Sequence, residues 1–186
     1  MKKTLVIVDF QKDFCRPDGS LYVKGSEEAK KEIIQHIKAD DSIEEIIFTL
    51  DWHPFNHCSF IDNGGEWPRH CVNYTEGAGI PEDLLAAAYA KTSNVVFSLK
   101  GTQSNKEEYG ALCAPKNKTI EVCGIALDYC VKNTIFNLFV YNSNPIETDI
   151  SLLKNMSPSI GEPSSVYDEL EKLNITINDI KYDHGL

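Results

Sequence analysis

The feature that most constrains the fold of this chain is an alternation of short β-branched runs with longer helical patterns. The runs cover residues 5–9, 45–51, 95–98 and 119–123, and each is apolar and bounded by turn residues. Apolar residues at helical spacing fill segments 27–37, 81–90 and 127–138 between or after them. Parallel strands need such crossovers, so the pattern predicts an α/β fold with helices on both faces of the sheet.

The last third of the chain follows this alternation less clearly. Residues 145–150 and 175–182 are expected to form strands, with a helix at 165–173 between them. Segment 143–162 is rich in Asn, Ser and Pro, and we expect it at the rim of a pocket or at a subunit contact. A length of 186 residues fits one domain over 1–186, without an internal repeat or linker.

The charge balance excludes several classes of partner. The chain has 18 Lys and Arg against 28 Asp and Glu, a net charge of −10, and its only arginines are Arg16 and Arg69. Phosphate backbones and anionic membrane surfaces require a basic patch, so no nucleic acid and no membrane partner is expected. The apolar run at the N-terminus is cut short by Asp9, which does not fit a signal peptide and predicts a cytoplasmic protein. The six cysteines are irregularly spaced and are expected to be free thiols.

Three chemically useful residues lie where predicted strands end. Asp9 ends the first run, Lys100 follows the third, and Cys130 lies in the first turn of the helix after the fourth. Ligands in open α/β sheets bind beyond the carboxyl ends of strands, so these side chains are expected to converge. A helix N-terminus and a nearby ammonium favour a thiolate, and a carboxylate can move the protons of a nucleophilic attack.

Each of these residues alone also fits an ordinary structural role. A lone cysteine is more often a small buried apolar residue, an aspartate can belong to a turn, and a lysine is usually a solvated cation. Their coincidence at strand ends favours a catalytic group of Asp9, Lys100 and Cys130.

A second group of polar residues lies in the long loop 53–79. Asp51 and His53 are two residues apart, so in extended chain both side chains point to one side, and His70 can complete the set. Two imidazoles and a carboxylate, with positions left open, suit one divalent transition metal ion such as Zn²⁺, Fe²⁺ or Mn²⁺. A polar loop without metal is the ordinary alternative. His57 is open to three roles, as a further ligand, as a partner of a ligand or as a pocket wall, while Cys58 and Cys71 are less favoured ligands.

The motifs that carry these residues resemble those of nicotinamidases, which are isochorismatase-like cysteine hydrolases. The similarity covers residues 4–142 and runs through V-D-F-Q-K-D-F at 8–14, D-W-H-P at 51–54, W-P-R-H-C at 67–71, K-G at 100–101 and G-I-A-L-D-Y-C-V at 124–131. It implies a three-layer, six-stranded, mainly parallel sheet. It also implies hydrolysis of nicotinamide to nicotinate and ammonia within NAD salvage, with pyrazinamide commonly accepted.

The resemblance assigns a role to each matching position. It implies Asp9, Lys100 and Cys130 as the catalytic triad, Asp51, His53 and His70 as metal ligands, and a cis peptide bond at Ile125–Ala126. The N–H groups of Ala126 and Cys130 would form the oxyanion hole, and the pocket would include Phe14, His57, Trp67, Ile125 and Tyr129. Tyr109-Gly110-Ala111 stands where the family often has Tyr-Ser before a hydrophobic residue.

Two other functions fit parts of the pattern. The same triad could hydrolyse an N-carbamoyl or ureido compound, although the carboxylate of such a substrate would need an arginine clamp. A noncatalytic module could instead hold structural zinc and sense redox state through Cys130. We expect a small-molecule substrate as the partner, and a homo-oligomer remains open.

Overall fold

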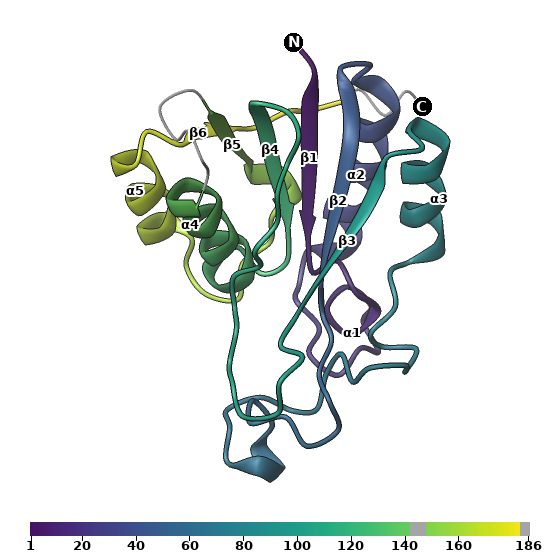
Figure 1. The fold of residues 1–186 in the computed structure, drawn as a ribbon, viewed down its shortest axis with the longest axis vertical. Coiled ribbons are helices and arrows are strands. Elements are labelled where there is room, and N and C mark those ends of the chain that lie inside the picture. The colour runs from purple at the N-terminus through teal and green to yellow at the C-terminus, as the bar shows by residue number, and fades with distance from the viewer. Residues whose placement is uncertain (142–147, 183–186) are drawn as a thin grey trace.

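The central element of the protein is one six-stranded sheet in which every pairing is parallel (Figure 1). The computed structural model describes residues 1–141 and 148–182. The strand order is β3-β2-β1-β4-β5-β6. The strands are β1 (Lys3–Val8), β2 (Ile43–Asp51), β3 (Val95–Lys100), β4 (Thr119–Gly124), β5 (Asp149–Leu153) and β6 (Thr176–Asn178). The predicted six-stranded, mainly parallel sheet is confirmed.

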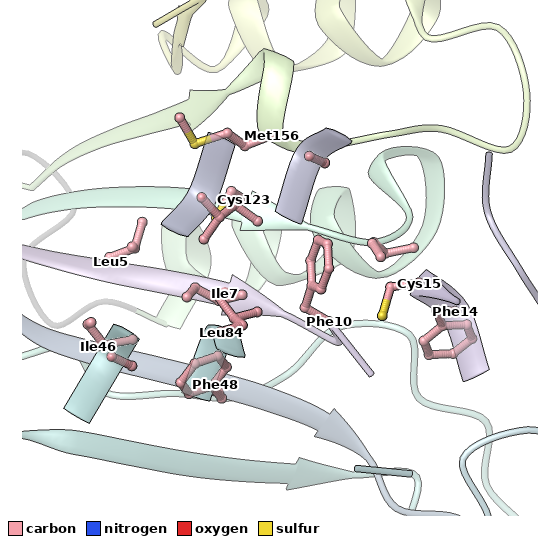
Figure 2. Close-up of a cluster of buried hydrophobic side chains, with 14 of the residues drawn as sticks. Leu5, Ile7, Phe10, Phe14, Cys15, Ile46, Phe48, Leu84, Cys123 and Met156 are labelled. Carbon is pink, nitrogen blue, oxygen red and sulfur yellow. The ribbon is translucent and has the colours of Figure 1, made fainter. Parts of the chain in front are cut away.

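Helices cover both faces of this sheet, as predicted (Figure 1). The helices are α1 (Lys12–Cys15), α2 (Ser26–Ala39), α3 (Glu82–Lys91), α4 (Lys132–Tyr141) and α5 (Ser164–Lys172). Alternate residues of β1 point to opposite faces: Leu5 and Ile7 pack with the α2 side, and Val6 and Val8 with the α4 side. Figure 2 shows the first of these two clusters, in which both strand and loop residues are buried.

The functional end of the sheet is set by the direction of its strands. β1, β2, β3 and β4 are parallel and in register, so their carboxyl ends meet at one edge. The long segment after β2 contains a short 3₁₀ turn at Ile61–Asn63, and the segment after β4 begins with a π-helical turn at Leu127–Val131. Among the described residues, no helix has the length and apolar character needed to cross a bilayer.

The C-terminal strands differ from the sequence-based expectation. β5 is Asp149–Leu153 rather than 145–150, because its ladder with β4 starts at the Thr119 and Asp149 pair; residues 142–147 lie outside the described part. The last strand is limited to Thr176–Asn178, not 175–182. Beyond it, Ile180 exchanges backbone hydrogen bonds with the side chain of Asn155 at 2.6 and 3.2 Å, which replaces a strand ladder.

Candidate active site

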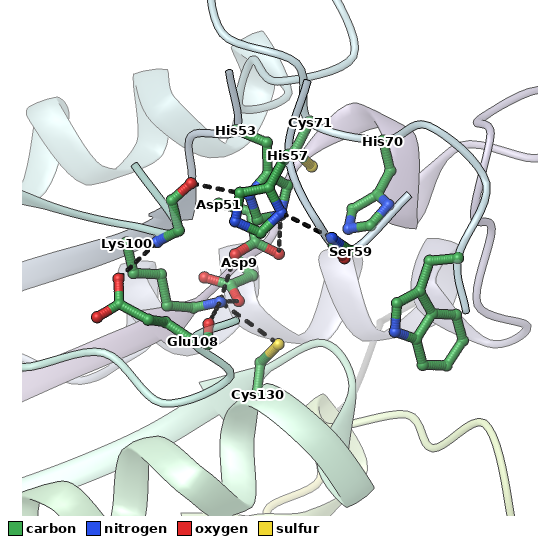
Figure 3. Close-up of polar contacts among 12 residues, drawn as sticks. Asp9, Asp51, His53, His57, Ser59, His70, Cys71, Lys100, Glu108 and Cys130 are labelled. Atoms are coloured by element: carbon green, nitrogen blue, oxygen red, sulfur yellow. Dashed lines mark hydrogen bonds and ion pairs between the residues drawn. The ribbon is translucent and has the colours of Figure 1, made fainter. Parts of the chain in front are cut away.

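Parallel strand ends bring Asp9, Lys100 and Cys130 together (Figure 3). Lys100 is the last residue of β3, Asp9 follows β1, and Cys130 lies in the π-helical turn after β4. The Lys100 Nζ atom is 2.8 Å from Asp9 Oδ2 and 3.6 Å from Cys130 Sγ. All three side chains are buried, so they interact in a low-dielectric site. The convergence expected from strand order is therefore present.

Asp9 is held in an unusual backbone conformation at the end of β1. Its φ is +46°, in the left-handed region that non-glycine residues rarely adopt. Asp9 Oδ1 accepts a hydrogen bond from Thr49 Oγ1 at 2.7 Å, and the buried Oδ2 atom is ion-paired with Lys100 Nζ at 2.8 Å. Burial raises the pKa of Asp9, and the ion pair with Lys100 opposes that shift. An Asp9 oxygen lies within 4.8 Å of Cys130 Sγ, so the carboxyl group is placed to exchange a proton with that sulfur.

Lys100 lies between Cys130 and Asp51, one of the expected metal ligands. Its Nζ donates to Asp51 Oδ1 at 2.5 Å and to the Glu108 backbone oxygen at 3.2 Å. Burial works against the ammonium charge, but Asp51 and Asp9 together raise the pKa of Lys100 well above its ordinary value. The lysine is a fixed cation beside the thiol rather than a proton donor.

The protonation state of Cys130 differs from the sequence-based expectation of a thiolate favoured by the helix N-terminus and by Lys100. Burial raises its pKa well above the ordinary value, Lys100 lowers it, and Asp9 and Asp51 raise it further. An Asp9 oxygen, an Asp51 oxygen and Cys130 Sγ lie within 4.8 Å of one another. Burial and two nearby carboxylates outweigh the single ammonium, so the thiol form of Cys130 is favoured and its reaction needs a base.

The segment that leads from β4 to Cys130 has an unusual backbone. The peptide bond between Ile125 and Ala126 is cis, as the family resemblance implies. Among the described residues, Cys130 N–H makes no hydrogen bond outside its own turn, and the Ala126 N–H is without a partner.

Asp51, His53 and His70 form a compact buried cluster. One ligand atom from each lies within 4.8 Å of the others. His53 Nδ1 is 3.0 Å from the Gly101 oxygen and His70 Nδ1 is 2.7 Å from the Pro68 oxygen, which leaves both Nε2 atoms for the cluster. A backbone carbonyl on the second nitrogen is the usual way to orient a metal-binding imidazole.

The protonation of the cluster also fits a bound cation. Burial opposes the charge of Asp51, yet Lys100 and the histidines hold its pKa well below the ordinary range. Burial lowers the pKa of His70, with Asp51 opposing, so this ring is neutral. Burial lowers the pKa of His53, but the hydrogen bond to Asp51 and the charge of Asp51 raise it overall, so His53 would have to lose a proton on binding a metal. An anionic carboxylate and a neutral imidazole are the forms that bind Zn²⁺, Fe²⁺ or Mn²⁺.

His57 lies outside both the ligand cluster and the pocket lining, so the structure does not match its expected place in the pocket wall. Its ring stacks on His53 with centroids 4.0 Å apart. His57 Nε2 is 3.0 Å from the Lys106 oxygen, and Nδ1 accepts a hydrogen bond from Ser59 N at 3.2 Å. Both ring nitrogens of His57 have hydrogen-bond partners, and its ring packs against the face of the His53 ring.

A pocket of about 420 Å³, including its open mouth, borders both groups. Cys130, Ala126, Asp51 and His70 contribute to its wall, and so do the expected pocket residues Phe14, Trp67, Ile125 and Tyr129. Trp67 and Tyr129 meet edge to face with centroids 5.2 Å apart. The wall is mostly flat and apolar with a few convergent polar groups, which suits a small aromatic ligand.

Sequence reasoning missed several residues of this wall: Leu21, Val23, Ser59, Glu107, Tyr109 and Ile160. Tyr109 receives a hydrogen bond from Trp67 Nε1 at 3.1 Å, and its departure from the family pattern was the only signal for it. Ile160 belongs to segment 143–162, whose expected place at the pocket rim it matches. The Asp128 carboxylate fixes the backbone at Ile160 and Gly161, because it accepts hydrogen bonds from their N–H groups at 3.1 and 2.8 Å.

Comparison with known proteins gives consistent matches over nearly the whole chain. A nicotinamidase from Saccharomyces cerevisiae is 30% identical over 220 residues, covering 95% of this chain and 99% of the yeast protein. The structure of a pyrazinamidase from Pyrococcus horikoshii in complex with zinc has a TM-score of 0.77 at 27% identity and covers 97% of this chain and 100% of its own. PnC1 from L. infantum in complex with nicotinate has a TM-score of 0.81 at 27% identity, with 95% and 92% covered.

The match to a sequence family leads to the same result. Residues 3–146 match the isochorismatase domain, a span that contains the buried triad, the Asp-His-His cluster and the first four strands of the sheet. Both the sequence match and the arrangement of the strands show that this chain belongs to the isochorismatase domain family.

Proposed function

We propose that this protein is a nicotinamidase, which hydrolyses nicotinamide to nicotinate and ammonia. The observation that carries the proposal is one mainly apolar pocket whose wall includes Cys130 as well as Asp51 and His70. A relative is named nicotinamidase, and one similar structure holds nicotinate. A pyridine carboxamide has an amide carbon that the Cys130 sulfur can attack and a ring nitrogen that a metal ion can bind. One such molecule would therefore interact with Cys130 and with the metal-ligand cluster at the same time.

In the first step, Asp9 takes the thiol proton of Cys130 while Sγ bonds to the carboxamide carbon. The carbonyl π electrons move to oxygen, and this oxyanion accepts hydrogen bonds from the N–H groups of Ala126 and Cys130. Lys100, which lies near both Asp9 and Cys130, stabilises the anions that form. Burial raises the pKa of Asp9, which makes its carboxylate a stronger base than an exposed aspartate.

In the second step, the tetrahedral adduct collapses and the C–N bond breaks. Asp9 returns its proton to the departing nitrogen, so ammonia leaves and a thioester on Cys130 remains. Asp9 then removes a proton from water as the water oxygen bonds to the thioester carbon. The C–S bond breaks, the sulfur recovers its proton, and nicotinate is released.

Asp51, His53 and His70 are the residues that would hold a divalent metal ion. Such an ion supplies a Lewis acid that orients the ring nitrogen, directly or through water. Phe14 and Trp67 would contact the faces of the ring and keep its carboxamide directed at Cys130. A zinc-bound pyrazinamidase of the same fold supports this assignment.

The arginines disfavour an N-carbamoyl or ureido substrate. Arg69 Nε pairs with Asp62 Oδ2 at 3.0 Å and its guanidinium lies over Phe55, while Arg16 pairs with Asp18 and Glu76. Neither arginine lines the pocket. A carboxylate substrate would find no free guanidinium there, whereas a neutral aromatic amide needs none.

The decisive test compares ammonia release from nicotinamide by the wild type and by Cys130→Ala. We expect turnover to fall by roughly 10³-fold or more, because the nucleophile is lost. Cys113→Ala, which removes a thiol outside the pocket, serves as the matched control and should retain activity. Turnover by Cys130→Ala within a few-fold of wild type would contradict the assignment of Cys130 as the nucleophile. Wild-type turnover of N-carbamoyl compounds that is faster than turnover of nicotinamide would contradict nicotinamide as the substrate.

A further inference from the structure

The free edge of β3 carries an unusual concentration of exposed apolar side chains. Val96, Phe97 and Leu99 are 39%, 42% and 49% exposed, and Leu112 beside them is 67% exposed. β3 is the end strand of the sheet (Figure 1). Soluble proteins usually protect such edges with charges, proline or a bulge. Residues 95–99 contain no charge and no proline, and their register with β2 has no bulge.

The backbone of this edge has hydrogen-bonding groups free to pair with another strand. The carbonyls of Asn94 and Lys100 accept hydrogen bonds from the β2 side, at 3.1 and 2.9 Å. Successive residues of a strand direct these groups to alternate sides, so Val95, Phe97 and Leu99 direct theirs outward. Among the described residues, no backbone partner meets them.

The two faces of the strand are also complementary to a copy of the same strand. Phe97 stacks on Phe48, with centroids 5.9 Å apart, and lies on the face that α2 covers. Val96 and Ser98 point to the other face, where Ser98 Oγ donates to the Leu112 oxygen at 2.9 Å. We call Val95, Val96, Phe97, Leu99 and Leu112 the β3 edge surface.

We propose that the β3 edge surface binds a second copy of this chain, with the two β3 strands antiparallel across a twofold axis through Phe97. This register places each Val95 opposite Leu99 and Phe97 opposite itself, so all outward-facing backbone groups pair in roughly six hydrogen bonds. Each cross-strand pair is then apolar with apolar, or Val96 with Ser98, and none places like charges together.

The size and charge of the surface agree with a symmetric dimer of modest affinity. The exposed area of these five residues is small compared with the roughly 800 Å² per partner of a standard interface, which places the dimer among weak associations that bury less than about 1,200 Å² in total. Each chain carries a net charge of −10, so two copies repel each other, and an uncharged contact surface adds no close like-charge pair to that repulsion. The dimer is therefore expected to tighten when NaCl rises from about 50 to about 500 mM.

Sedimentation velocity over a range of protein concentrations tests the interface with Phe97→Lys. The wild type should dimerise with a micromolar dissociation constant, and two facing lysines on the axis should weaken it at least about 10-fold. Tyr89→Lys is the matched control, because Tyr89 is 55% exposed on α3 and lies outside the β3 edge surface. A wild type that stays monomeric, or an equally strong Phe97→Lys dimer, would overturn the proposal.

Cross-linking of Phe97→Cys gives an independent test of the register. Its readout is the formation of a disulfide rather than the loss of an interaction. Facing residues of a hydrogen-bonded antiparallel pair have Cα atoms about 5.5 Å apart, a separation that a disulfide spans. Mild oxidation should yield a covalent dimer of Phe97→Cys, and none of Tyr89→Cys or of the wild type with its six native thiols. Failure of Phe97→Cys to cross-link above these controls would exclude the proposed register.

Discussion

At the residue scale, the site depends on a small set of charged groups that are buried against one another. Lys100 faces Asp9, Asp51, Cys130 and a backbone carbonyl, so its charge is fixed among anions. Asp9 is fully buried, and its carboxylate contacts the Lys100 ammonium and the Thr49 hydroxyl within reach of Cys130. Burial raises the pKa of Asp9 while Lys100 lowers it, and a carboxylate with a raised pKa is a stronger proton acceptor.

Replacing Asp9 with Asn tests this base. The amide keeps the shape of the side chain but cannot take a proton, so kcat should fall roughly 10²- to 10⁴-fold while KM changes little. Alkylation of Cys130 by iodoacetamide should slow in parallel, because the same deprotonation precedes both reactions. Asp18→Asn, at an exposed carboxylate, is the control; an unchanged alkylation rate in Asp9→Asn would remove Asp9 from the role of base.

At the element scale, the cluster of Asp51, His53 and His70 depends on the loop after β2 and the loop after β3, which meet at the end of the sheet. His53 Nδ1 is hydrogen-bonded to the backbone oxygen of Gly101, which directly follows β3. The Gly101 N–H in turn donates to Glu108 Oε2 at 3.0 Å. Gly101 has a φ of +61°, and a Cβ there would lie 2.4 Å from His53 Cε1. A glycine is therefore required both by the backbone and by the neighbouring ring.

Gly101→Ala should weaken zinc binding. The added methyl displaces the His53 ring, and loss of ligand orientation is expected to raise the dissociation constant for zinc about 10- to 100-fold. Gly64→Ala is a matched control, since its φ is +88° but no atom lies within 4 Å of the added Cβ. Equilibrium dialysis with zinc compares the two; equal affinity in both variants would show that His53 does not depend on this contact.

At the scale of the whole molecule, a second buried polar network joins elements far from the active site. Glu121 of β4 accepts from Lys3 of β1 at 2.7 Å and lies 2.8 Å from His36 of α2. His36 in turn contacts Tyr182 near the end of the described chain at 2.5 Å. This network joins the sheet, a covering helix and the C-terminal segment, so its effect belongs to global stability.

The stability contribution of Glu121 should depend on pH. Burial opposes its charge, but His36 and Lys3 lower its pKa below the ordinary value. A lowered pKa in the folded state stabilises the protein above the ordinary carboxyl pKa of about 4.3, and this contribution is lost as the pH falls toward the folded value. Glu121→Gln should therefore cost about 2 kcal/mol at pH 7 and progressively less below about pH 4.

Urea unfolding from pH 7 to about pH 3.5 measures this difference. Glu171→Gln, at an exposed carboxyl on α5, controls for the loss of one negative charge and should differ little from wild type at any pH. A difference between Glu121→Gln and wild type that stays constant over the whole range would show that the ionised carboxylate does not contribute.

The sequence by itself determined the sheet, its covering helices and the edge at which Asp9, Lys100 and Cys130 meet. Those features depend on local periodicity and on parallel strand direction, which neighbouring residues encode. Only the tertiary structure decided that His57 supports His53, that Ile160 and Tyr109 complete the pocket, and that the Cys130 thiol rests protonated. Ring orientation, pocket walls and pKa depend on burial and on partners distant in sequence, which a local pattern does not specify.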